Sequence, residues 1–130
     1  MSLAFPKPAK GTSRAERLDR RAEIERIETH AKLAAKMRDG YRCRVPGCTV
    51  NTKAWRLESA HLVTKGMGGD HGIHSHHRRD YVTTCFLHHQ GQRSLHSGDL
   101  KAVPLTAEAG DGPVQWQELR ESGWTILGVS

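Results

Sequence analysis

The sequence predicts a small α+β fold in one domain, from three observations. Apolar residues recur at helical spacing near the N-terminus, two apolar segments flank a turn near the C-terminus, and cysteine and histidine pairs lie between them. The chain has 130 residues, of which 36% are hydrophobic and 5% aromatic. Because so few large apolar residues can build only a small core, we expect a metal ion to stabilise the middle of the chain.

The N-terminal part of the chain predicts a basic arm followed by one long helix. The first residues combine prolines, a glycine and lysines without periodicity, which predicts disorder. Ser13 and Glu16 then form the pattern of a capping box, which starts a helix. The apolar residues that follow at helical spacing are Ile24, Ile27, Ala31 and Ala34. We expect this helix over about residues 14–38, ended by Asp39-Gly40.

Positive charge is concentrated in the first hundred residues. Residues 1–42 carry a net charge of +5, residues 43–100 carry +3 and residues 101–130 carry −2, for a total of +6. A small protein with this charge favours nucleic acid as a partner. The predicted helix exposes Arg14, Arg17, Arg20, Arg21 and Arg26, interleaved with acidic residues. Two interpretations of that face stay open: a solvated surface laced with ion pairs, or a surface that contacts DNA.

Shorter elements are expected after the long helix. They are, in chain order, a strand near residues 55–57, a glycine-rich loop within 61–84, a short helix within 85–96, and a hairpin whose strands 114–119 and 124–129 flank a four-residue loop. A long loop without secondary structure usually carries function, so the glycine-rich segment is a candidate part of the site.

Cysteine and histidine residues in the middle of the chain are spaced like metal ligands. Four residues with a Pro-Gly turn separate Cys43 from Cys48, and two residues separate Cys85 from His88. A turn inside each pair brings its side chains to a common point, and thiolate and imidazole ligands favour a structural zinc. The alternative is that the three cysteines are small buried apolar residues. Three cysteines cannot all pair within one chain, so disulfides are not expected to hold the fold.

Three segments resemble the zinc-containing HNH endonucleases of phages and mobile elements. They are the Cys43–Cys48 pair, the run from Ala60 to Asp70, and the run from Asp80 to His89. The resemblance implies a ββα-metal unit, also called a His-Me finger, clasped round a catalytic metal. The expected organisation is a disordered basic arm at 1–12, an N-terminal helix at 13–38, an HNH core with structural zinc at 39–100, and a C-terminal β-hairpin extension at 101–130.

The resemblance also implies roles for single residues. His61 takes the position of the general base, which an imidazole suits because its ordinary pKa lies near 6.5. Asp80 stands where the family usually has the asparagine that orients this histidine. His89 takes the position of a ligand of the catalytic divalent ion, and His88 that of the fourth ligand of the structural zinc. His96, seven residues beyond His89, is expected near the same helix face as a further ligand of the catalytic ion.

The sequence departs from the family pattern at Ala60. The family often has a metal ligand at this position, and an alanine cannot bind a metal. The missing ligand is then expected from Asp80 or from one of His71, His74, His76 and His77. Asp80 can either orient His61 or bind the metal itself, and the metal role is slightly favoured because Ala60 leaves the ion short of ligands.

The chemistry that the resemblance implies is hydrolysis of DNA phosphodiesters with a catalytic Mg, Mn, Ni or Zn ion. Arg78, Arg79 and Lys65 are candidates to bind flanking phosphates. DNA is the expected partner, a second protein could supply sequence specificity, and no membrane contact is expected. The chain lacks a signal peptide and a long apolar run, so a cytoplasmic location is expected, that of the host if a phage encodes it. Two alternatives stay open: a non-catalytic zinc module that binds nucleic acid, and a zinc protein that serves protein partners.

Overall fold

The computed structural model describes residues 13–50, 56–62 and 77–130. Its elements are α1 (Arg14–Arg38), β1 (Leu57–His61), the 3-10 helix η1 (Arg78–Asp80), β2 (Tyr81–Cys85), α2 (Phe86–Gln90), β3 (Leu100–Pro104), the 3-10 helix η2 (Ala109–Asp111), β4 (Val114–Arg120) and β5 (Gly123–Val129). The mixed α+β class with an N-terminal helix is therefore confirmed. The calls on the basic arm and on Lys65, His71, His74 and His76 lie outside the described residues.

Local signals in the sequence set both ends of α1. The Ser13 hydroxyl accepts a hydrogen bond from the Glu16 backbone N–H, and the Glu16 carboxylate accepts one from the Ser13 N–H, so the predicted capping box is present. At the other end Gly40 has a φ of +65°, and the chain returns with hydrogen bonds from Gly40 to Met37 and from Tyr41 to Lys36. This is the Schellman pattern, in which glycine tolerates the left-handed conformation.

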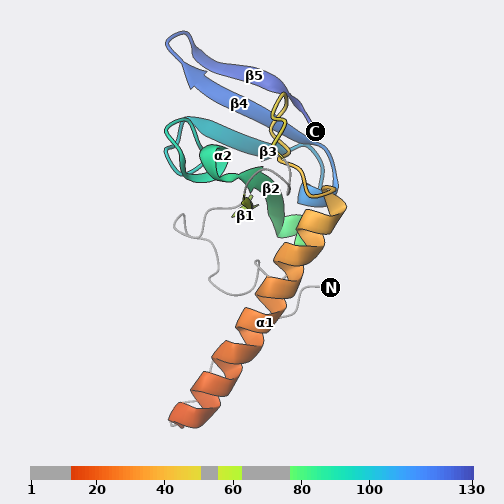
Figure 1. Ribbon diagram of the computed structural model, residues 1–130, viewed down its shortest axis with the longest axis vertical. Coiled ribbons are helices and arrows are strands. Elements are labelled where there is room, and N and C mark those ends of the chain that lie inside the picture. The colour runs from red at the N-terminus through yellow and green to blue at the C-terminus, as the bar shows by residue number, and fades with distance from the viewer. Residues whose placement is uncertain (1–12, 51–55, 63–76) are drawn as a thin grey trace.

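Helix α1 extends away from the two sheets, and only its C-terminal part packs, against β1 and β2 (Figure 1). Ala31 and Ala35 are its buried residues, and they contact the buried ring of Tyr81 on β2. Small side chains at these two positions let the helix approach β2 closely. No helix in the described part of the chain is both long and apolar enough to cross a membrane.

The strands form two antiparallel sheets. Strand β1 pairs with β2 so that His61 lies opposite Tyr81, and α2 begins directly after β2. Strands β3, β4 and β5 form the second sheet in that order. The predicted C-terminal hairpin is therefore present within a three-stranded sheet, whose β3 the sequence did not indicate. The expected four-residue loop was wrong: Arg120 pairs with Gly123, which leaves a two-residue turn.

The hydrophobic core lies where the two sheets meet the cysteine-containing segment. Its buried members include Val82 on β2, Trp116 and Val114 on β4, and Leu100 on β3, together with Cys43, Val45, Ala60 and Cys85. The indole N–H of Trp116 donates to the Ser130 hydroxyl, so this buried polar atom is paired. The core is small, as the composition predicts, and two of its buried members are cysteines.

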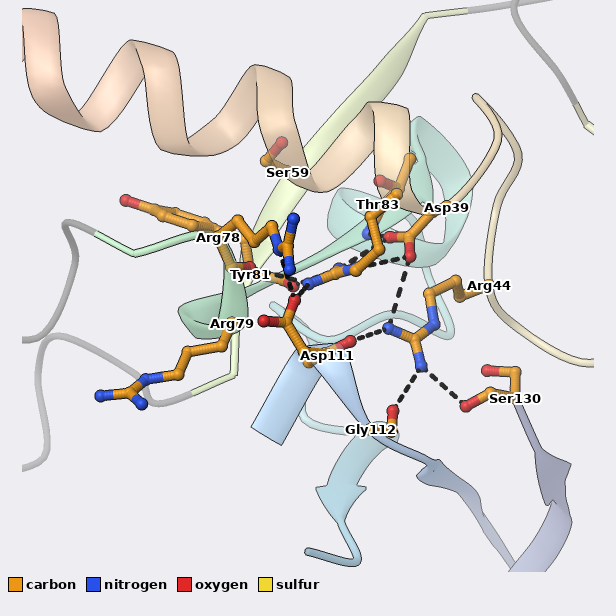
Figure 2. Close-up of polar contacts among 12 residues, drawn as sticks. Asp39, Arg44, Ser59, Arg78, Arg79, Tyr81, Thr83, Asp111, Gly112 and Ser130 are labelled. Carbon is orange, nitrogen blue, oxygen red and sulfur yellow. Dashed lines mark hydrogen bonds and ion pairs between the residues drawn. The ribbon is translucent and has the colours of Figure 1, made fainter. Parts of the chain in front are cut away.

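A buried network of charged side chains joins segments that are distant in the sequence (Figure 2). The Asp39 carboxylate accepts hydrogen bonds from the Arg38 guanidinium and from the backbone N–H of Thr83, and it forms an ion pair with Arg44. Arg44 also donates to the carbonyls of Gly110, Gly112 and Ser130. The C-terminal sheet is thereby attached to the end of α1 and to β2.

Asp111 extends the network to η2. Its Oδ1 atom lies 3.0 Å from Nη1 of Arg38 and 2.9 Å from Nε of Arg78. Burial acts to raise the pKa of Asp111, but the hydrogen bonds from Arg78 and Arg38 outweigh it, so the pKa lies below its usual value. A carboxyl with a lowered folded-state pKa stabilises the fold only where it is ionised.

We predict that Asp111→Asn lowers the free energy of unfolding at pH 7 by about 1–3 kcal/mol, because two charged hydrogen bonds are weakened. The difference from the unmodified protein should shrink as the pH falls below about 3.9, the ordinary pKa of an aspartate, and through the lower folded-state pKa. Urea unfolding at several pH values measures both effects. Glu121→Gln, which removes an exposed carboxylate in the β4–β5 turn, is the control; a pH-independent difference for Asp111→Asn would contradict the linkage.

Candidate metal centre and histidine site

The segment before β1 forms the first half of a metal centre. Cys43 and Cys48 flank a turn in which the Cys48 backbone N–H donates to the Val45 carbonyl, 3.0 Å away. Gly47 has a φ of +83°, the conformation that position three of a type II turn requires, and Pro46 supplies the preferred residue before it. The Pro-Gly turn predicted from the sequence is thus present and places both thiols on the same side.

The second half comes from the junction of β2 and α2. Cys85 is the last residue of β2, and His88 lies one turn into α2. Nδ1 of His88 is 3.2 Å from Sγ of Cys85 and 3.5 Å from Sγ of Cys43, while Sγ of Cys48 is 4.0 Å from Sγ of Cys85. The four ligand atoms all lie within 4.8 Å of one another. The predicted Cys3His cluster is assembled and can bind a metal such as zinc.

The chemistry of the donor set fits an ion. Cys43 and Cys85 are buried, and burial, with the neighbouring thiols, raises the pKa of Cys43 to about 12 in the absence of a metal. Burial also lowers the pKa of His88, which keeps the imidazole neutral and its lone pair available. A bound cation would replace the thiol protons and balance the thiolate charge, so binding releases protons and stabilises the fold together.

A separate hollow of about 750 Å³ lies beside this cluster, and histidines from three segments line it. His61 lies at the end of β1, His89 on α2 and His96 in the turns that follow α2. His88 and His89 are adjacent on one helical turn, so they point in different directions: His88 reaches the cysteines and His89 reaches the hollow. The other lining residues are Ala60, Leu62, Leu95, Gly98, Leu100, Lys101, Ala102 and Trp124.

Glu58 is a site residue that the sequence did not reveal. Its Oε1 atom lies 3.0 Å from Nδ1 of His89, and the Gln90 amide also donates to this carboxylate. Fixing Nδ1 orients the ring and leaves Nε2 on the opposite side as the nitrogen for a ligand, the arrangement that carboxylate–histidine pairs produce around metals. The sequence offers one signal for Glu58. Residues two apart on a strand share a face, so Glu58 lies on the same face of β1 as Ala60.

The expected helix through residue 96 was wrong. Helix α2 ends at Gln90, so His96 does not share a helix face with His89. The chain instead turns back, the His96 backbone N–H donates to the His89 carbonyl, and the two imidazole centroids are 4.4 Å apart. The two histidines are close, but a reversal of the chain brings them together. Within the described ranges, the Cys3His cluster is the one group of three or more ligand side chains gathered within 4.8 Å.

The other predicted site residues lie at η1. Asp80 precedes Tyr81, the partner of His61 across the ladder, and the Asp80 Oδ2 atom accepts a hydrogen bond from the His77 backbone N–H, 3.1 Å away. The Arg78 guanidinium pairs with Asp111. Arg79 points away from the buried network (Figure 2). The Asp80 carboxylate thus caps η1, and it is not among the described residues that line the hollow.

Comparisons of the chain with protein-family models, with curated proteins and with solved structures find no match. What the site can do therefore follows from its residues and their geometry.

We predict one tightly bound zinc per chain, lost in Cys48→Ser together with the cooperative thermal transition, because metal binding is coupled to folding in thiolate sites. Elemental analysis of protein prepared without chelators measures the metal, and circular dichroism measures the transition. Thr49→Ser, which shortens the exposed neighbouring side chain, should keep both. Zinc-free protein that still unfolds cooperatively would contradict the prediction.

Proposed function

We propose that the chain is a metal-dependent HNH-type endonuclease that hydrolyses DNA phosphodiester bonds. The observation that carries the proposal is that His61 and His89 line one hollow beside the Cys3His cluster. This combination of a histidine hollow and a neighbouring cysteine cluster resembles the zinc-containing HNH site. The order β1, β2, α2, with His61 on the first strand and His89 on the helix, agrees with a ββα-metal unit. Both histidines are those that the family resemblance selected from the sequence.

His61 is proposed as the general base. Its ring lies 4.7 Å from that of Tyr81, centroid to centroid, on the neighbouring strand. Because Tyr81 is fully buried against α1, this contact limits how the imidazole can rotate. A base held in one orientation can accept the proton of a water molecule that attacks phosphorus in line.

His89 is proposed as a ligand of a catalytic divalent ion, with His96 beside it. The Glu58 carboxylate orients His89 and strengthens its remaining nitrogen as a donor. When bound, such an ion supplies positive charge to the phosphate oxygens as the bond to the leaving oxygen breaks. The chain's own contribution is to present these nitrogens from a short helix and a tight reversal, beside the proposed base.

A second hollow supports DNA as the substrate. It lies between α1 and η1, has a volume of about 690 Å³, and is lined by Arg26, His30, His77 and Arg78, with Ile27, Ala31 and Ala34. Basic groups along a groove are the usual contacts to a phosphate backbone. This location favours the interpretation that part of the arginine-rich face of α1 contacts DNA.

One observation favours a second candidate, a non-catalytic zinc module that binds nucleic acid. Ala60, at the position of a family metal ligand, is only 1% exposed and belongs to the hydrophobic core. The catalytic ion would then rely on other ligands. Cleavage assays separate the two candidates, because both bind nucleic acid and only one hydrolyses it.

We predict that His61→Ala lowers the rate of plasmid cleavage by about 10²–10⁴-fold, the usual contribution of a general base. DNA affinity and thermal stability should stay nearly unchanged, since the base acts in the transition state. Nicking assays with magnesium, manganese, nickel or zinc measure the rate. Glu121→Gln, which changes an exposed side chain that lines neither hollow, should cleave within a few-fold of the parent; an active His61→Ala protein would place the base elsewhere.

For Asp80→Asn we predict cleavage within about tenfold of the parent, roughly 1.4 kcal/mol of barrier, and an unchanged half-saturating concentration of the metal. An amide oxygen can still accept the His77 N–H, and asparagine is the residue to which the family resemblance gives the proposed role of orienting His61, so that role tolerates this change. The measurement is cleavage rate against metal concentration. A large increase in the half-saturating concentration, with the rate recovered at high metal, would assign Asp80 as a ligand instead.

A further inference from the structure

We propose that Lys101 and Trp124 of the C-terminal sheet form a phosphate-binding wall of the histidine hollow, which holds the DNA backbone next to the bond to be cut. The inference rests on the proposed function for the identity of the polyanion. It extends that function because it assigns a substrate-binding role to the C-terminal sheet, which lies outside the segment that resembles the HNH family.

The position of Lys101 on the sheet directs it toward this role. Lys101 follows the buried Leu100 on β3, and its own side chain is exposed. Both residues line the hollow that His61 and His89 also line. Lys101 is the one permanently charged side chain among the described residues of that lining.

Trp124 on β5 holds the lysine in place. The Lys101 ammonium lies 4.2 Å from the centroid of the Trp124 ring, within the range of a cation–π contact. The indole is 43% exposed, and it also lines the hollow. A flexible lysine that is held over a ring loses less freedom when it binds an anion, which favours a preorganised binding site.

Lys101 has no carboxylate partner among the described residues, in contrast to several arginines. Arg38 and Arg78 pair with Asp111, and Arg93 pairs with Glu118, but no carboxylate of the described residues pairs with Lys101. Residues 101–130 carry a net charge of −2, and Lys101 and Arg120 are their two basic side chains. A lone lysine beside three histidines suits a phosphate that enters the hollow from outside.

The test measures DNA binding apart from cleavage. In a His61→Ala background, the affinity for a short DNA duplex is followed against salt concentration for Lys101→Met and Lys101→Arg. Loss of one phosphate contact should make the slope of log affinity against log salt shallower by about 0.9, and arginine should restore it. Arg120→Met, which removes a charge of the same sheet that does not line the hollow, should leave the slope unchanged.

Trp124 is tested as a positioning residue. With His61 intact, Trp124→Leu should raise KM several-fold with little change in kcat, whereas Trp124→Phe, which keeps an aromatic face, should restore KM. Thermal melts show whether each variant folds; if Trp124→Leu does not fold, the exposed Lys101→Met variant alone decides.

The outcomes separate this inference from the proposed function. A slope that Lys101→Met leaves unchanged, or that Arg120→Met changes equally, would overturn the phosphate-binding wall even if the protein cleaves DNA. If the salt dependence of DNA binding depends on Lys101 but neither the parent protein nor any variant cleaves DNA, the result would support the phosphate-binding wall and contradict the proposed nuclease function. Binding of polyglutamate that depends on Lys101, with DNA binding that does not, would assign the wall to an acidic protein partner and overturn the inference.

Discussion

The buried carboxylate of Asp39 is the contact on which the arrangement of the chain depends. Its side chain is 4% exposed. It forms ion pairs with Arg38 at the end of α1 and with Arg44 in the cysteine segment, and it accepts a hydrogen bond from the Thr83 N–H on β2. A buried charge without its partners costs about 3–5 kcal/mol, so these segments can meet only in a geometry that satisfies it. In a chain with a small apolar core, this requirement helps to fix the relative positions of the segments, which apolar packing fixes in larger domains.

The network and the metal centre are coupled through adjacent residues. Cys43 directs its thiol to the metal cluster, while Arg44 directs its guanidinium to Asp39 and to the C-terminal carbonyls. On β2, the Thr83 N–H donates a hydrogen bond to Asp39 of the network, and Cys85 belongs to the Cys3His cluster. Structural zinc sites contribute about 10–16 kcal/mol in small domains, so an ion bound here would fix the same two segments that the charged network joins.

Sequence reasoning succeeded where the signal was local. The limits of α1 follow from Ser13, Glu16 and Gly40, and the ligand pairs follow from spacings of a few residues. It failed where contacts are long-range. Nothing near Arg38 or Arg44 indicates bonds to Asp111 or Ser130, which lie 73 and 86 residues away. Strand β3 is five residues long and contains a proline, so its pairing with β4 is what defines it.

The same distinction explains the histidine site. The motif selected His61, His88 and His89, but Glu58 reaches His89 only because β1 and α2 pack together, 31 residues apart in sequence. Helix α2 is a little over one turn long, and its two neighbouring histidines serve the cysteine cluster and the hollow. A helix this short is not stable by itself, so it relies on packing against β1 and β2, and a metal bound through His88 would hold it further. A metal in the Cys3His cluster would then fix the helix that carries His89, while Glu58 orients the imidazole itself, and the proposed chemistry in the hollow depends on both.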